Sequence, residues 1–156
     1  MLPWLESTAL ATWVRESPSL LAYPTVLTLH TAGLGIVVGA AVVVDVRLLG
    51  YARRISVATL EPLFTVMACA FALNAATGAL LFIADATTKA KQPVFYLKLA
   101  MIFVALWCTF ATRRIVRDNS ESTAVDTVPT QGGRLATASL LMWAGAIAAG
   151  RLMAYL

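Results

Sequence analysis

The chain has 156 residues, of which 60% are hydrophobic and 13% are charged, and its mean hydropathy is +0.79. Soluble domains average roughly 45–50% apolar and about 25% charged residues, so a soluble globule of this composition would expose unusually large apolar surfaces. Intrinsic disorder requires low hydrophobicity and high net charge, which this chain with its formal charge of +4 does not have. The basic residues lie between apolar blocks rather than in one stripe, which argues against nucleic-acid binding. The composition therefore predicts a small all-α, polytopic integral membrane protein.

The first segment, residues 3–16, predicts a short interfacial helix at the membrane surface. Leu5, Ala9 and Trp13 recur at helical spacing and form an apolar side, which Glu6 interrupts. Together with the four apolar stretches described below, this segment is expected to form a single membrane domain, residues 1–156.

Four apolar stretches approach the ~20 residues that a transmembrane helix needs. They are residues 21–49, 62–84, 93–112 and 135–156. Pro62 and Pro93 each open a stretch, where the missing N–H costs little. Residues 116–134 are rich in Ser, Thr, Asp and Gly and predict a linker. The expected architecture is a four-helix transmembrane bundle that runs up, down, up and down.

Small residues four apart predict close helix packing in two of these stretches. Gly35 and Gly39 form one such pair, and Ala146 and Gly150 form the other. Such pairs let membrane helices approach closely. Packing within the bundle is the expected use, and a seam between two copies is the alternative.

The distribution of basic residues predicts the orientation in the membrane. Seven arginines fall in the two loops that join the first stretch to the second and the third to the fourth: Arg47, Arg53, Arg54, Arg113, Arg114, Arg117 and Arg134. The opposite side carries five basic residues: Arg15, Lys89, Lys91, Lys98 and Arg151. Because arginine-rich short loops stay in the cytoplasm, we expect a bacterial inner-membrane protein with a cytoplasmic linker and both termini in the periplasm.

Each apolar stretch carries one polar group at a similar depth from the periplasmic side. These groups are His30, Asn74, Lys98 and Arg151. At ~1.5 Å of rise per residue, all four fall roughly 7–15 Å below the outer boundary. Ionisable groups inside a membrane are costly and are functional candidates. The plainer interpretation is that Arg151 and Lys98 reach to the headgroups while His30 and Asn74 hydrogen-bond neighbouring helices.

A site for haem b is the first functional hypothesis. His30 would bind the iron, and Gly33, one turn further along, would leave room for the macrocycle. Lys98 and Arg151 would neutralise the propionates, and Asn74 lies in the same layer. The sixth ligand would be Met101, on the same face as Lys98, or His30 of a second copy, or nothing. The chain would then be a redox or electron-transfer subunit.

The alternative hypotheses need no iron. One is a non-catalytic accessory or anchor subunit, and the other is a protein that binds lipid or quinone. In both cases the expected partners are membrane lipid and either a second copy of the chain or a larger membrane complex. Cys69 and Cys108 lie inside apolar stretches, where thiols act mainly as small apolar side chains.

Asp45, near the end of the first stretch, has a separate expected role. An ion pair with Arg113 or Arg114 would fix the end of this helix at the membrane interface.

The chain resembles a family of small bacterial inner-membrane proteins with four helices. The resemblance is carried by H-T-A-G-L at 30–34, D-V-R-L-L-G at 45–50, T-G-A-L-L-F at 77–82 and F-Y-L-K-L-A at 95–100. It implies the fold but no activity. The chain is more distantly similar to membrane haem proteins such as the membrane-type protoporphyrinogen oxidases, and to copper-resistance membrane proteins. That similarity implies haem or porphyrin contact at His30 and Lys98.

Overall fold

The described part of the computed structural model covers residues 2–51, 53–121, 130–153 and 155, and it contains helices and no strand. The elements are α1 (Leu2–Glu6), α2 (Ala9–Glu16), α3 (Tyr23–Leu48), the 3-10 helix η1 (Val57–Leu60), α4 (Glu61–Ala84), α5 (Ala86–Lys89), α6 (Pro93–Glu121) and α7 (Thr130–Leu152). The helical fold and the four long apolar helices are confirmed. By length and composition, each of these four helices is able to cross a membrane.

Several helix boundaries differ from those expected. The third long helix continues nine residues past 112, through a polar segment that has the composition of a linker. The fourth begins at Thr130 rather than 135. Much of the predicted linker, residues 122–129, lies outside the described residues.

The segment 3–16 is two helices rather than one. Ser7 and Thr8 separate them, and the Thr8 side chain caps α2 by accepting a hydrogen bond from the backbone N–H of Ala11 at 3.3 Å. Hydroxyl side chains favour such N-cap positions over helix interiors. Both short helices pack on the end of the bundle, α1 against α5 and α2 against α4.

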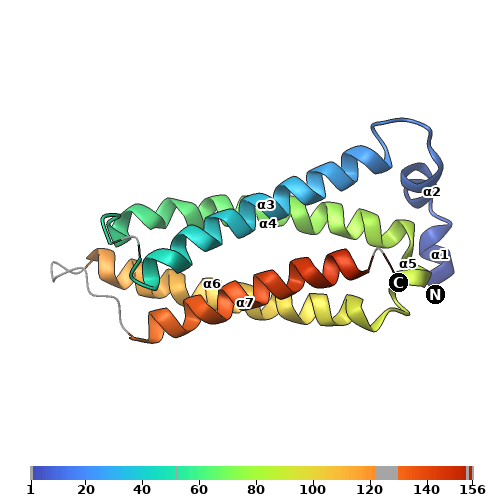
Figure 1. Cartoon of the computed structure of the whole chain (residues 1–156). Coiled ribbons are helices and arrows are strands. Elements are labelled where there is room, and N and C mark those ends of the chain that lie inside the picture. The colour runs from blue at the N-terminus through green and yellow to red at the C-terminus, as the bar shows by residue number, and fades with distance from the viewer. Residues whose placement is uncertain (1, 52, 122–129, 154, 156) are drawn as a thin grey trace.

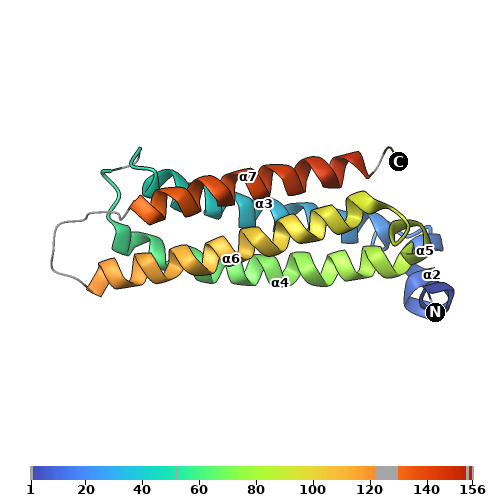
Figure 2. The ribbon, with the colours of Figure 1, turned by 90° about the horizontal axis from the view of Figure 1, so that it is seen from below.

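The bundle consists of two antiparallel helix pairs, α3 with α4 and α6 with α7 (Figures 1 and 2). Both chain termini lie at one end, which we call the terminal end. The other end carries the α3–η1 loop and the α6–α7 connection, together with the seven arginines named for the two loops, and we call it the arginine end. The two pairs meet mainly where α3 contacts α7.

The hydrophobic core lies toward the arginine end. On α3 it uses one face, Val37, Ala41, Val44 and Leu48, at spacings of three or four residues. Residues of η1, α4, α6 and α7 complete it: Val57, Leu60, Phe64, Met67, Ala70, Ala105, Val116, Ala136 and Trp143. The opposite half of the bundle, toward the terminal end, is where the structure opens into a cavity.

Much of the outer surface is apolar. On α6 the side chains of Phe103, Trp107 and Phe110 are 74%, 61% and 64% exposed. They follow each other at helical spacing on one outward face. Contiguous exposed apolar surface of this kind is unusual on soluble monomers and suits contact with lipid chains.

Candidate ligand-binding cavity

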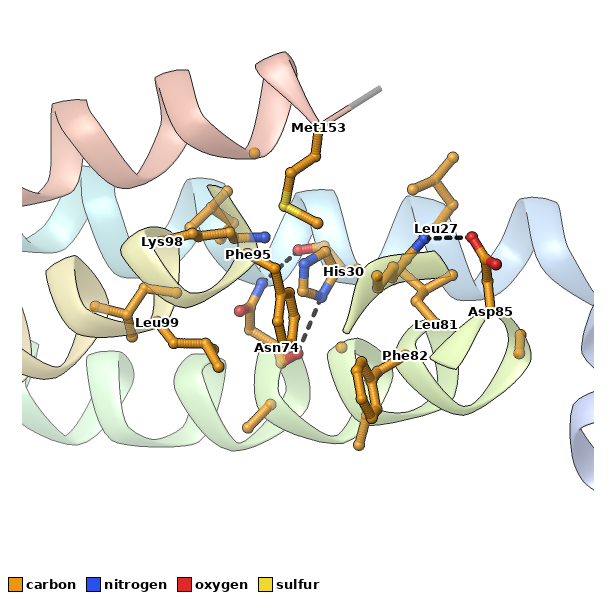
Figure 3. Close-up of a pocket in the computed structure, with 18 of the residues that line it drawn as sticks. Leu27, His30, Asn74, Leu81, Phe82, Asp85, Phe95, Lys98, Leu99 and Met153 are labelled. Carbon is orange, nitrogen blue, oxygen red and sulfur yellow. Dashed lines mark hydrogen bonds and ion pairs between the residues drawn. The ribbon is translucent and has the colours of Figure 1, made fainter. Parts of the chain in front are cut away.

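A cavity of about 870 Å³ lies between the two helix pairs at the terminal end (Figure 3). Its walls are mostly apolar, with aromatic and aliphatic side chains that include Tyr23, Leu27, Leu34, Phe71, Leu81, Phe82, Phe95, Leu99 and Ile102. The polar lining groups are few: Arg15, His30, Asn74, Asp85, Lys89 and Lys98. A largely apolar pocket of roughly 300–1,000 Å³ with a few convergent polar groups is typical of small-molecule sites.

His30 of α3 is held by the neighbouring helix α4. Its ring Nδ1 lies 3.0 Å from the backbone oxygen of Asn74 and 3.2 Å from Oγ1 of Thr77. A carbonyl oxygen only accepts hydrogen bonds, and the Thr77 hydroxyl already donates to the backbone oxygen of Leu73 at 2.7 Å. Nδ1 must therefore carry the proton and donate it.

This tautomer leaves the other ring nitrogen with a free lone pair. Within the described chain, Nε2 of His30 has no hydrogen-bond partner, and His30 points toward Lys98 and Met153 across the cavity (Figure 3). His30 therefore offers the lone pair of Nε2 to the cavity, on the side where Lys98 enters.

Asn74 completes the connection between α3 and α4. Its side-chain amide donates to the backbone oxygen of His30 at 2.7 Å, while its own backbone oxygen accepts from the His30 ring. The Asn74 side chain is 7% exposed. Its amide is thus used in joining two helices, and the residue positions His30 rather than offering a free donor to a ligand.

Two glycines make room beside the polar groups. A Cβ at Gly78 of α4 would lie 3.0 Å from Cε1 of His30. A Cβ at Gly150 of α7 would lie 3.5 Å from Nζ of Lys98. Gly78 admits the imidazole ring between the helices, and Gly150 gives Lys98 its space.

Lys98 is the cation that enters the cavity from α6. Among the described residues, its ammonium group has no hydrogen-bond or ion-pair partner. It is half-buried among apolar side chains, where an unpaired charge is costly. An anionic group of a bound molecule would offset that cost.

Further charged groups lie at the rim, toward the terminal end. Lys89 pairs with Asp85 at 3.1 Å, and Arg15 of α2 donates to the backbone oxygen of Ala84 at 3.2 Å. Partial burial raises the pKa of Asp85, but hydrogen bonds from Thr88 and Lys89, and then the positive charges of Lys89 and Arg15, outweigh burial and leave the pKa below its ordinary value. The rim carboxylate is therefore ionised at neutral pH and offsets part of the positive charge.

The structure brings together three of the six residues proposed from sequence and separates the others. His30, Asn74 and Lys98 line the cavity, whereas Gly33, Met101 and Arg151 do not. Gly33 faces α4, where a Cβ would lie 3.2 Å from the backbone oxygen of Ala70 and 3.3 Å from the backbone nitrogen of Asn74. Its small size therefore serves helix packing.

Met101 and Arg151 point elsewhere for different reasons. The Met101 sulfur packs against Gly145 of α7, where a Cβ would lie 2.8 Å away. Arg151 is exposed at the end of α7. The methionine that lines the cavity is Met153, which the sequence analysis does not single out.

The aromatic bridge across the cavity rim is a second feature that sequence reasoning misses. Phe82 of α4 and Phe95 of α6 stack with ring centroids 5.1 Å apart, and both line the cavity. Each lies close to the α4–α6 connection, so the short loop between the helices was the available signal. Arg15 and Lys89 also line the cavity, although the sequence analysis used them only to predict the orientation in the membrane.

Asp45 makes contacts other than the expected ones. Its carboxyl group is hydrogen-bonded by the Ser139 side chain of α7, and it is 2% exposed. Arg113 instead pairs with Glu61 at 3.2 Å. Asp45 thus lies inside the bundle rather than at its surface.

His30 is the only histidine of the chain and lines the cavity. The described residues contain no group of three or more His, Cys, Asp or Glu side chains able to hold a metal ion. A metal would therefore have to bring most of its ligands with it, as iron does in a porphyrin.

Comparisons of the chain with family models, curated proteins and solved structures gave no match. The resemblances noted in the sequence stay predictions. The function of this chain is therefore inferred from the chemistry of the cavity.

Proposed function

We propose that this chain is a membrane protein that binds haem b in the cavity, where Nε2 of His30 would hold the iron. The observation that carries the proposal is the fixed tautomer of His30. Histidines that bind metals usually donate their other ring N–H to a carbonyl or carboxylate, which orients the ring and increases its basicity. The Nδ1 bond to the Asn74 backbone oxygen is of that kind.

Haem fits the cavity in both size and polarity. The volume of about 870 Å³ lies in the range of ligand pockets, and most of the lining is aromatic or aliphatic. Lys98 supplies a cation without a partner among the described residues, suited to one propionate, and Lys89 lies at the rim for the second. Arg151, which the sequence suggested for this role, does not line the cavity.

When bound, haem would supply one-electron redox chemistry. The protein residues would orient the ligand, exclude water and hold the propionates. Met153 points toward His30 in Figure 3 and lines the cavity, so its thioether, rather than that of Met101, is the candidate for a second protein group that would bind the iron. Electron transfer is the reaction class that this set of groups supports best.

The proposed location is the inner membrane of a bacterium. Support comes from the four long apolar helices, the exposed aromatic face of α6 and the seven arginines at one end. Since short loops rich in arginine stay in the cytoplasm, the arginine end would face inward. The terminal end, with the cavity, would then face the periplasm.

The test is a dithionite-reduced minus oxidised visible spectrum of the protein purified in detergent after expression with added haem. A Soret shift with α and β bands is expected for the wild type, and their loss is expected for His30→Ala. Thr31→Ala is the matched control. This neighbouring side chain is exposed and bonds only its own helix, at the backbone oxygen of Leu27, so its spectrum should be unchanged.

A second pair of variants tests the propionate role. Lys98→Gln should weaken haem binding on the order of 10-fold, the size expected for a lost hydrogen bond to a charged group. Arg151→Gln removes the same charge at the same end of the bundle, but outside the cavity lining, and should leave binding unchanged. A flat wild-type spectrum from folded protein with ample haem would overturn the proposal.

A lipid or quinone ligand is the second candidate. One observation favours it: the cavity holds a single histidine, while most of its lining is hydrophobic and Lys98 is free to meet a polar head group. A colourless protein whose organic extract contains a lipid or quinone, released by Lys98→Gln, would support it. A colourless, empty protein that co-purifies with other membrane proteins would instead indicate an accessory subunit, and light scattering would show whether copies of the chain associate.

A further inference from the structure

A second polar site lies in the bundle, far from the cavity. Asp45 is one turn from the end of α3 at the arginine end, and its side chain is 2% exposed. His30 is fifteen residues away on the same helix, roughly 22 Å at 1.5 Å per residue. The two sites are therefore separate.

The hydrogen bonds of Asp45 do not satisfy a carboxylate. The side chain of Ser139, itself 1% exposed, hydrogen-bonds the carboxyl group. The second oxygen, Oδ2, is buried and has no hydrogen-bond partner. A buried carboxylate is stable only when it is paired or bonded by several donors, because losing its hydration costs several kcal/mol or more.

Arg47 of α3 and Arg113 of α6 each bind a group other than Asp45. Arg47 is two residues from Asp45, a spacing that places the two side chains on different sides of α3, and its Nε donates to the backbone oxygen of Ile55. Arg113 of α6 binds Glu61. Glu61 is the one acidic residue of α4; its Oε1 accepts from Arg113, and its Oε2 is buried without a hydrogen-bond partner.

Two further helices, α6 and α7, bring polar groups to this part of the bundle. Cys108 of α6, 1% exposed, lies close enough to Asp45 for the two groups to interact electrostatically. On α7, Arg134 is exposed, and Trp143 lies one turn beyond Ser139. The Trp143 indole N–H is buried without a hydrogen-bond partner.

We propose that Asp45 is a proton-binding site, whose carboxyl group keeps its proton at neutral pH within the α3–α7 contact. A proton on the carboxyl removes the uncompensated charge that burial would otherwise impose. On release, the O–H bond breaks, the proton passes to water at the arginine end one turn away, and a carboxylate remains. The Ser139 O–H is the donor already bonded to the carboxyl group, and the unpartnered Trp143 N–H, one turn further along α7, is a second donor that such a carboxylate would recruit.

Infrared spectroscopy of the full-length protein in detergent at neutral pH tests this site. The C=O stretching band of a protonated carboxyl group is expected in the wild type, shifted in D₂O, and absent in Asp45→Asn. Asp85→Asn is the matched control: that carboxyl is part-exposed and paired with Lys89, so the variant should keep the band. Ser139→Ala should keep the band but shift its frequency, because it removes the hydrogen bond and retains the acid.

Two results would overturn the proposal. One is a wild-type spectrum without a protonated carboxyl band at neutral pH. The other is a band that neither Asp45→Asn nor Ser139→Ala changes; the second variant serves if the first does not fold. The His30→Ala protein gives the same readout without haem, so failure of the haem proposal and failure of this one are distinguishable.

Discussion

The most discriminating stability test concerns the glycines of α3. Gly33 faces α4, and a Cβ there would lie 3.2 Å from the backbone oxygen of Ala70, closer than the ordinary contact range of 3.4–4 Å. Gly35 and Gly39 form the packing pair that the sequence pattern favoured, yet a Cβ at either position would have no neighbouring atom within 4 Å. The same substitution, glycine to alanine, therefore meets a neighbouring helix at one position and open space at two others.

The expected magnitude follows from two opposing terms. Alanine is favoured over glycine in a helix by about 1 kcal/mol, and this gain is common to all three positions. At Gly33 alone, the obstructing atoms belong to the α4 backbone, so the two helices must separate by a few tenths of an ångström. Overpacking of this kind typically costs about 1–3 kcal/mol. Gly33→Ala should therefore be about 1–3 kcal/mol less stable than Gly35→Ala.

Unfolding in mixed micelles, followed by circular dichroism, measures the difference. Gly35→Ala and Gly39→Ala serve as controls for the intrinsic helix preference, because they lie on the same helix and change the same atoms. Equal free energies of unfolding for Gly33→Ala and Gly35→Ala would refute the assignment of Gly33 to the α3–α4 contact. Light scattering of the two control variants checks the alternative use of this glycine pair as a seam between copies.

Three further predictions concern the ends of the bundle. Because the pKa of Asp85 is lower in the folded protein, its contribution to folding stability is present above the ordinary carboxyl pKa and is lost as pH falls through the folded value. The melting temperature of Asp85→Asn should therefore depend less on pH than that of the wild type between about pH 5 and pH 2. Glu6 accepts a hydrogen bond from the backbone N–H of Thr87 at 2.6 Å, so Glu6→Ala should increase proteolysis of α1 and leave the melting of the long helices unchanged. The exposed Glu61–Arg113 pair should contribute less than about 1 kcal/mol in a double-mutant cycle, and a larger coupling would contradict this exposed geometry.

The long helices could be predicted from sequence because their signal is compositional. Runs of apolar residues near 20 in length need no tertiary information to be recognised, and Pro93 is the first residue of both the predicted and the observed third helix. The extension of α6 to Glu121 could not be predicted in this way. Its polar residues resemble a linker in composition, and a hydropathy pattern does not distinguish a solvated helix from a solvated loop.

The cavity was predictable only in part, for a geometric reason. The depth below the membrane boundary, counted in residues along each helix, grouped His30, Asn74 and Lys98, and all three line the cavity. Residues at equal depth on different helices are able to meet. Depth contains no information about rotation around the helix axis. Met101 lies three residues beyond Lys98, yet its side chain turns to Gly145 rather than to the cavity.

The hydrophobic core that stabilises the bundle and the polar groups that would bind a ligand lie toward opposite ends of the molecule. The buried apolar core lies toward the arginine end, where the α3 face containing Val44 meets α7 residues such as Trp143. The cavity lies toward the terminal end, where glycine at position 78 and the bond from His30 to α4 hold a polar ring between helices. Changes to His30 that abolish ligand binding should therefore leave unfolding nearly unaffected, within the roughly 0.6 kcal/mol that an interhelical hydrogen bond contributes on average in a membrane. Truncation of Val44 would do the reverse, since it removes packing from the buried core that residues of both helix pairs form.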